Sequence, residues 1–192
     1  NDPNTKNVSA NGQPLITAES ANNTLEYWSI DKAGNMEPHK ILTEIKLDKT
    51  IPIGAIKIAG NAPYTNSSST TLTLSATDAT SGPAQMRFSN DNVTWSSWEA
   101  YATSKAWTLT SGDGTKTVYY QIKDNAGLNS TIESDTIALD TLPPSIALTT
   151  SISNGTKIKS STYTISWTAT DTVSGIDHYE VRLDTGTWSN IG

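Results

Sequence analysis

Aspartates at the ends of strand-like segments are the residues whose type and spacing suggest a chemistry in this sequence. Asp78 and Asp124 each follow a segment of alternating apolar residues, and Asp48 lies in a linker that ends in proline. In an antiparallel sandwich of this strand order, the turns after the second and sixth strands emerge at one pole, where the linker also arrives. We therefore expect Asp48, Asp78 and Asp124 to gather at a first junction.

Close carboxylates repel one another, and a hard cation with roughly six to eight oxygen ligands would remove that repulsion and stiffen the joint. The same reasoning brings Asp140 and Asp171 together at a second junction. The sequence thus carries the hypothesis of structural calcium held by these five aspartates, with no other cofactor required.

Two simpler interpretations of the aspartates stay open. Their side chains can act as turn formers that accept hydrogen bonds from nearby backbone amides. Alternatively, Lys49 and Lys123 stand beside Asp48 and Asp124 and can neutralise them.

An internal repeat of about 93 residues organises the chain. The following pairs all have a spacing of 93 positions: Asp31 and Asp124, Tyr27 and Tyr120, Asp78 and Asp171, and Trp95 and Trp188. We expect three parts: the C-terminal half of one repeat (1–51), a complete repeat (52–143) and the N-terminal half of another (144–192).

Short strands are the expected secondary structure throughout. The segments with a two-residue apolar period are 25–30, 41–47, 53–58, 71–77, 84–88, 106–109, 117–123, 136–139, 146–148, 163–169 and 179–183, with a further short strand at 14–17, a turn at Asn22-Asn23, and a strand or irregular connection at 95–101. Six or seven strands in about 90 residues without a helical period indicate an all-β fold of tandem immunoglobulin-like antiparallel β-sandwiches.

Composition excludes several classes of function. The net charge is -6 and the few basic residues form no cluster, which makes nucleic acid a poor partner. Cysteine is absent, so thiolate chemistry and disulfides are excluded. No apolar run has the length of a membrane span.

The motifs resemble the tandem immunoglobulin-like and fibronectin-III-like repeats of large bacterial or archaeal cell-surface proteins. They are the Asp-x-Ala-Gly turns 31–34 and 124–127, the Ala-Thr-Asp-x-x-Ser-Gly turns 76–82 and 169–175, and the proline-bearing linkers 47–52 and 139–144. The resemblance implies an extracellular or cell-surface spacer, adhesin arm, surface-layer component or filament, with calcium at the junctions. Pro83 departs from the pattern, since the other copy has Ile176 there.

Catalysis finds little support, and we expect no enzyme. His39 and His178 lie in unrelated contexts without a motif, and regular sandwich repeats imply no cleft for paired carboxylates. The alternative to a structural role is an adhesive or carbohydrate-binding module that contacts cell-surface glycans through Trp95, Trp98 and Tyr101, although packing of these rings is favoured.

Six Asn-x-Ser/Thr sequons are candidates for glycosylation: Asn7, Asn22, Asn66, Asn92, Asn129 and Asn154. In a chain this rich in Asn, Ser and Thr each one is weak evidence, since several arise by chance.

The phase of the repeat at the two ends leaves two interpretations open. Either the sequence is a window from a longer repetitive chain, or successive subunits complete one another's split repeat and form a fibre. The expected partners are therefore neighbouring repeats or copies of the same chain, arranged head to tail.

Overall fold

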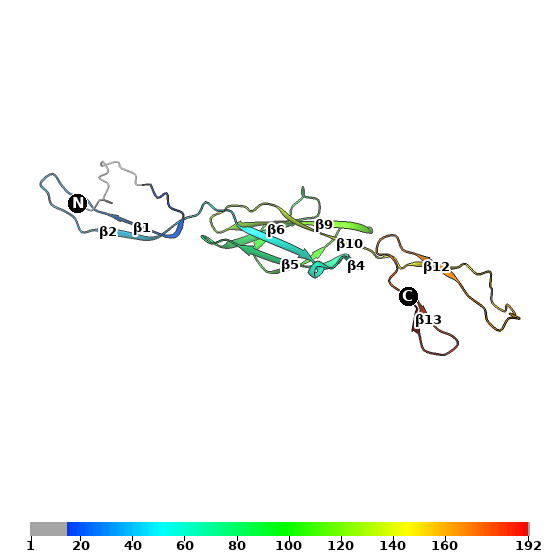
Figure 1. Cartoon of the computed structure of the whole chain (residues 1–192). Coiled ribbons are helices and arrows are strands. Elements are labelled where there is room, and N and C mark those ends of the chain that lie inside the picture. Colours follow the sequence, from blue (N-terminus) through cyan, green and yellow to red (C-terminus); the bar gives the residue numbers. More distant parts are fainter. Residues whose placement is uncertain (1–14, 192) are drawn as a thin grey trace.

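The computed structural model describes residues 15–191, and these residues form an all-β chain, as predicted (Figure 1). The strands are β1 Ser20–Tyr27, β2 Lys40–Leu47, β3 Ile53–Ile58, β4 Tyr64–Thr65, β5 Ser69–Thr77, β6 Pro83–Ser89, β7 Glu99–Ala100, β8 Ser104–Thr108, β9 Gly114–Asp124, β10 Glu133–Leu139, β11 Ser145–Leu148, β12 Trp167–Thr170, β13 Glu180–Val181 and β14 Ser189–Asn190. A 3-10 turn covers Ala59–Asn61. Within this described part, no helix is long and apolar enough to span a membrane.

Two sheets make up the middle of the chain, residues 52–143. One has the strand order β4-β10-β9-β6-β7 and the other has the order β3-β5-β8. All of their pairings are antiparallel except the short parallel pair of β4 and β10.

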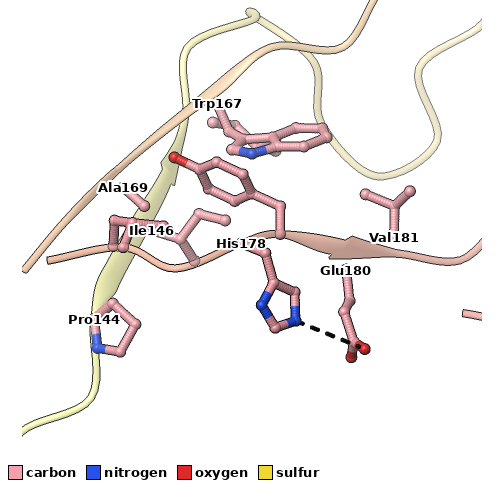
Figure 2. A pocket seen from close by; sticks show the side chains of 10 residues that line it. Pro144, Ile146, Trp167, Ala169, His178, Glu180 and Val181 are labelled. Carbon is pink, nitrogen blue, oxygen red and sulfur yellow. Dashed lines mark ion pairs between the residues drawn. The ribbon is translucent and has the colours of Figure 1, made fainter. Parts of the chain in front are cut away.

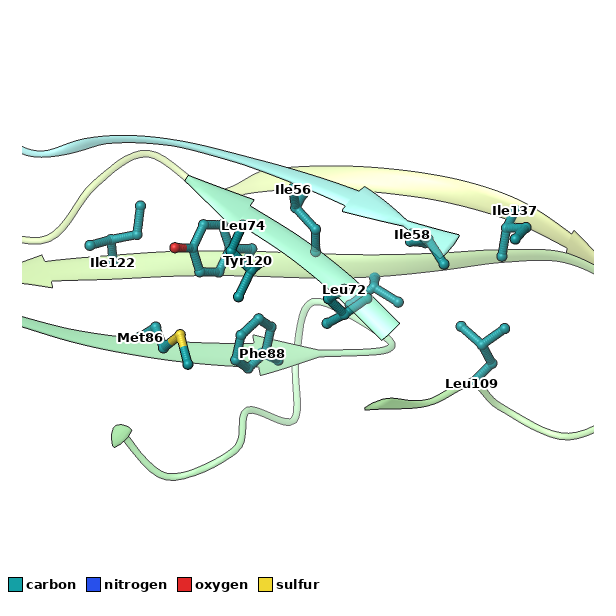
Figure 3. Close-up of a cluster of buried hydrophobic side chains, with 11 residues drawn as sticks. Ile56, Ile58, Leu72, Leu74, Met86, Phe88, Leu109, Tyr120, Ile122 and Ile137 are labelled. Carbon is teal, nitrogen blue, oxygen red and sulfur yellow. The ribbon is translucent and has the colours of Figure 1, made fainter. Parts of the chain in front are cut away.

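A single hydrophobic cluster contains buried side chains from both sheets (Figure 3). Its members follow the two-residue alternation expected of half-buried strands: Ile56, Ile58, Leu72, Leu74, Met86, Phe88, Leu109, Val118, Tyr120, Ile122 and Ile137. Phe88 stacks on Tyr120 with ring centroids 5.4 Å apart. Full burial of each aliphatic or Phe side chain contributes about 1.5 to 3 kcal/mol, so this cluster is the main source of stability for residues 52–143.

At residues 25–27 and 40–42, the hairpin β1–β2 has the register of β9–β10. Tyr27 pairs with Lys40 in the first hairpin, and Tyr120 pairs with Glu133 in the second. Both members are shifted by 93 positions, the spacing found in the sequence.

The hairpin β11–β12 likewise has the register of β3–β5. Leu148 pairs with Trp167, as Ile56 pairs with Leu74. The spacing between equivalent residues is 92 in the first strand and 93 in the second. The connection between β11 and β12 is therefore one residue longer than the connection between β3 and β5.

Two predictions near the N-terminus are wrong. Residues 15–17 of the predicted strand 14–17 are not in a strand, and residue 14 lies outside the described part. The predicted turn at Asn22-Asn23 instead lies within β1, where the register with β2 shifts on both sides of Asn23. An extra residue accommodated as a bulge lets polar residues of a turn-like sequence remain in a strand.

Two strands near the C-terminus are shorter than predicted. Of the segment 163–169 only residues from Trp167 onward are paired, and of 179–183 only Glu180–Val181. In the middle of the chain β5 is paired on both sides, by β3 and β8. Among residues 145–191, β12 is paired with β11 alone, so fewer ladder hydrogen bonds hold it extended.

Gly54 lies where β3 comes close to β9. A Cβ atom at this position would meet the side chains of Ile122 and Tyr120. The space between the sheets at this point is therefore filled by Ile122, and glycine is required by the close approach.

We expect Gly54→Ala to lower the free energy of unfolding by about 1 to 3 kcal/mol, because the added methyl group overpacks the core. Ala55→Val adds atoms to the neighbouring, exposed position and is expected to change it by less than about 0.5 kcal/mol. Urea denaturation of both variants measures this difference, and equal stabilities would contradict the assigned packing.

Candidate metal centre

Asp78 and Asp124 each close a turn with one carboxylate oxygen. Asp78 Oδ1 accepts backbone hydrogen bonds from Thr80, Ser81 and Gly82 at 3.2, 2.8 and 2.7 Å. Asp124 Oδ1 accepts them from the backbone N–H groups of residues 126 and 128, both at 2.8 Å. The prediction that these aspartates form turns is consistent with this geometry.

The equivalent aspartates close the same turns. Asp31 Oδ1 accepts from the backbone N–H of Ala33 and Asn35 at 2.9 and 2.8 Å. Asp171 Oδ1 accepts from residues 173, 174 and 175 at 3.1, 2.9 and 2.9 Å. Gly82 and Gly175 both have φ near +78°, at 78° and 79°, a conformation that glycine adopts readily.

Hydrogen bonding also sets the charge of Asp78. Burial on its own would raise the pKa of this carboxyl, but the backbone N–H groups of Gly82, Ser81 and Thr80 outweigh it and hold the pKa below its ordinary value. Asp78 is therefore a carboxylate at neutral pH.

Asp48 reaches the same place from the linker. Its Oδ1 accepts from the backbone N–H of Thr50 at 3.0 Å. Asp48, Asp78 and Asp124 each contribute an oxygen to a group whose atoms all lie within 4.8 Å of one another. The structure thus brings together the three aspartates predicted for the first junction.

The second oxygen of each aspartate has no partner. Oδ2 of Asp48, Asp78 and Asp124 is buried and accepts no hydrogen bond, and Asp124 as a whole is only 2% exposed. Two charges at this spacing repel by about 3 kcal/mol at an effective dielectric constant of about 20. Buried polar atoms are normally paired, and three unpaired carboxylate oxygens in one place are the kind of ligand set that could hold a cation.

The donor set fits calcium. Oxygen ligands lie about 2.3 to 2.6 Å from calcium, so ligands on opposite sides of the ion are about 5 Å apart. The 4.8 Å limit of this cluster falls within that span. Calcium bound there would supply a positive charge that joins the linker to the two turns.

Glu19 is a fourth carboxylate at the first junction that the sequence analysis missed. Its Oε1 accepts from the backbone N–H groups of Lys49 and Thr50, both at 3.1 Å, and from Thr80 Oγ1 at 3.4 Å. Hydrogen bonds from the Thr50 side chain and from the linker backbone lower the pKa of Glu19 to about 2. The sequence feature that could have identified Glu19 is its position, because it immediately precedes strand β1.

Asp140 and Asp171 are neighbours at the second junction. The backbone N–H of Ser174 lies 3.1 Å from Asp140 Oδ2 and 2.9 Å from Asp171 Oδ1. Asp113, which directly precedes β9 as Glu19 precedes β1, accepts from the backbone N–H of Thr141 at 3.0 Å. Its Oδ2 is buried without a partner.

The lysines beside these aspartates have other contacts. Lys49 Nζ donates to the backbone carbonyl of Thr17 at 2.9 Å. Lys123 Nζ lies 4.2 Å from the centroid of the Trp98 ring. Among the ion pairs of the described residues, neither lysine is paired with Asp48 or Asp124.

Trp95 and Trp98, two of the three residues predicted for sugar binding, both contact the Arg87 side chain. The Arg87 guanidinium carbon lies 4.7 Å from the centroid of the Trp95 ring and 4.6 Å from that of Trp98. Arg87 Nε and Nη2 also donate to Gln121 Oε1 at 3.0 and 2.6 Å. Tyr101 packs against the hydrophobic core, so these contacts favour packing of the three rings.

The sequons within residues 15–191 are accessible. Asn22, Asn66, Asn92, Asn129 and Asn154 are all exposed. Asn7 lies outside the described residues. Their glycosylation stays a prediction.

Comparison with known proteins gives a likeness to solved structures alone. No family model and no curated protein matches this chain. Among solved structures, the PKD1 domain of Vibrio anguillarum Epp is similar over 50% of this chain and 100% of that domain, with 15% sequence identity and a TM-score of 0.38. A TM-score this low does not establish a shared fold.

We expect Arg87→Met to lower the free energy of unfolding by about 1 to 3 kcal/mol, because it removes the hydrogen bonds to Gln121 and the cation over two rings. Tryptophan fluorescence should change as well. Lys57→Met, on an exposed position of β3, is the control and should leave both readouts unchanged. Chemical denaturation followed by tryptophan fluorescence measures both quantities. An Arg87→Met variant with the stability and fluorescence of the wild type would refute the packing role.

Proposed function

We propose that this chain is a non-catalytic structural segment of an extracellular surface arm, surface layer or filament. Immunoglobulin-like β-sandwiches of about 93 residues follow one another head to tail in this proposal. The matched registers and turns support the repeat. The observation that carries the function is the cluster of Asp48, Asp78 and Asp124, because it lies where the linker enters residues 52–143.

The proposed mechanism is mechanical. Glu19 and Asp48 belong to the preceding part of the chain and its linker, whereas Asp78 and Asp124 belong to residues 52–143. A cation among these carboxylates would hold both sides of the joint and oppose bending. Pro52, the last residue of this linker, is buried, and its fixed φ removes a further degree of freedom.

The histidines support the non-catalytic part of the proposal. His39 Nδ1 is 2.8 Å from Glu26 Oε1, and its ring stacks on Trp28. His178 Nδ1 is 2.7 Å from the exposed Asp177. Each histidine is thus paired with an exposed carboxylate instead of a nucleophile.

Calcium is expected to stabilise the chain. At about a hundredfold excess over the dissociation constant, binding adds about 2.7 kcal/mol to the free energy of unfolding. For a unit of this size, that corresponds to an increase in Tm of roughly 10 to 20 °C. Differential scanning calorimetry of the full chain in calcium and in chelator measures the increase.

Asp124→Asn should remove most of the calcium dependence of Tm. Asparagine keeps a carbonyl oxygen for the turn, removes one charge and places an amide donor beside the remaining carboxylates. We expect a Tm in chelator equal to or above that of the wild type, and little response to calcium. Asp177→Asn, the same change at a side chain that is 97% exposed, is the matched control and should keep the full response. A wild-type Tm that is the same in calcium and chelator would overturn the metal centre.

A further inference from the structure

A hollow with a volume of about 430 Å³ lies where the connection from β6 to β7 meets β8, an edge strand of the other sheet. This Trp95 hollow is lined by residues that include Phe88, Asn90, Asp91, Thr94, Trp95 and Trp107. All of them lie within residues 52–143, which have their own hydrophobic cluster. Aromatic walls with a few polar groups, around a volume between about 300 and 1,000 Å³, are typical of small-molecule sites.

Two indole rings in the Trp95 hollow are held by neighbouring side chains. Trp107 Nε1 donates to Asn90 Oδ1 at 2.8 Å, and the Trp107 ring centroid is 5.3 Å from that of Phe88. The Arg87 guanidinium carbon lies 4.7 Å from the centroid of the Trp95 ring. Arg87 is not among the lining residues, so part of the Trp95 ring stays open to the hollow. Side chains that are held in this way lose little conformational freedom when a ligand packs on them.

The side-chain donors around these rings already have acceptors. Asn90 Nδ2 and Ser96 Oγ donate to backbone carbonyl oxygens at 3.1 and 3.2 Å. Ser89 Oγ donates to Asp91 Oδ1 at 2.8 Å. Because Trp107 Nε1 is bonded to Asn90, a ligand rich in acceptors would find few donors in the hollow.

Asp91 supplies the hollow with an acceptor. Its Oδ1 also accepts from the backbone N–H groups of Val93 and Thr94 at 2.8 and 2.7 Å. These hydrogen bonds lower the pKa of Asp91 to about 2, so the side chain is a carboxylate at neutral pH. A carboxylate has acceptor sites on both oxygens. Since the short hydrogen bonds of Asp91 all go to Oδ1, its Oδ2 is available to a ligand that donates.

A sugar ring matches this combination of groups. The C–H groups on one face of a pyranose carry partial positive charge and pack on the negative face of an indole ring, while its hydroxyl groups donate to a carboxylate. We propose that the Trp95 hollow binds a neutral pyranose residue of a glycan, with the sugar ring on Trp95 and its hydroxyl groups bonded to Asp91. This binding activity goes beyond the structural role of the chain.

Charge favours a neutral sugar over two other ligands. An organic cation also binds to the face of an indole, but the Arg87 guanidinium already lies against Trp95, and like charges repel. An acidic sugar would be repelled by the Asp91 carboxylate for the same reason. A neutral pyranose avoids both repulsions.

Calorimetric titration of the full chain tests the proposal. The probes are hexasaccharides of glucose, galactose, mannose and N-acetylglucosamine, and at least one should bind with a Kd of about 1 mM or tighter. Trp95→Ala removes the ring, and Asp91→Asn keeps the oxygen that the turn needs but replaces the other with a donor. Each should weaken binding about tenfold or more. Trp95→Phe retains an aromatic face and should bind more tightly than Trp95→Ala, which separates loss of the ring from loss of the fold.

A second hollow provides the control for location. Its lining includes Trp167 and Tyr179 (Figure 2), whose ring centroids are 5.9 Å apart, so aromatic rings are present there as well. Tyr179→Ala should bind the probes as the wild type does. Asp177→Asn makes the same chemical change as Asp91→Asn at a side chain that is 97% exposed, and it should also leave binding unchanged.

Three results would overturn the proposal. The first is that none of the four hexasaccharides binds. The second is binding that is lost in Tyr179→Ala and kept in Trp95→Ala, because the sugar would then occupy the other hollow. The third is that choline or an oligogalacturonate binds and the neutral probes do not.

Discussion

The junctions depend on the different roles of the two carboxylate oxygens of each aspartate. Oδ1 is committed to the turn, because it accepts the backbone N–H groups that would otherwise be unpaired. Oδ2 is then fixed in direction and cannot turn toward water without breaking those bonds. When three such turns meet at a junction, three charged oxygens are buried without partners. The hydrogen bonds that fold the turns also create the charge that a cation would neutralise.

This constraint gives the chain a direction. Each junction combines residues from a linker with residues from the turns that follow it, so the arrangement is not symmetric. Asp48 meets Asp78 and Asp124 at one end of residues 52–143, and Asp140 meets Asp171 at the other. Equivalent groups thus recur along the chain, as expected if stiffness is needed at every joint and not only within each sheet.

Much of this arrangement could be predicted from the sequence because strand alternation and turn chemistry are local. The segment 53–58 has the predicted bounds, and strand direction together with the position of the linker predicts that Asp48, Asp78 and Asp124 lie together. Glu19 and Asp113 were not found, because a carboxylate before a strand has no turn motif to mark it. The strand at 163–169 was overestimated, since alternation predicts a face but not the partner strand that would hold it.

Crystallography of the full chain in calcium tests the central claim most directly. An anomalous difference map should show a peak bonded to Oδ2 of Asp48, Asp78 and Asp124, at about 2.3 to 2.6 Å from each oxygen. A map in which these oxygens bind only water, or in which the three side chains point apart into solvent, would contradict it.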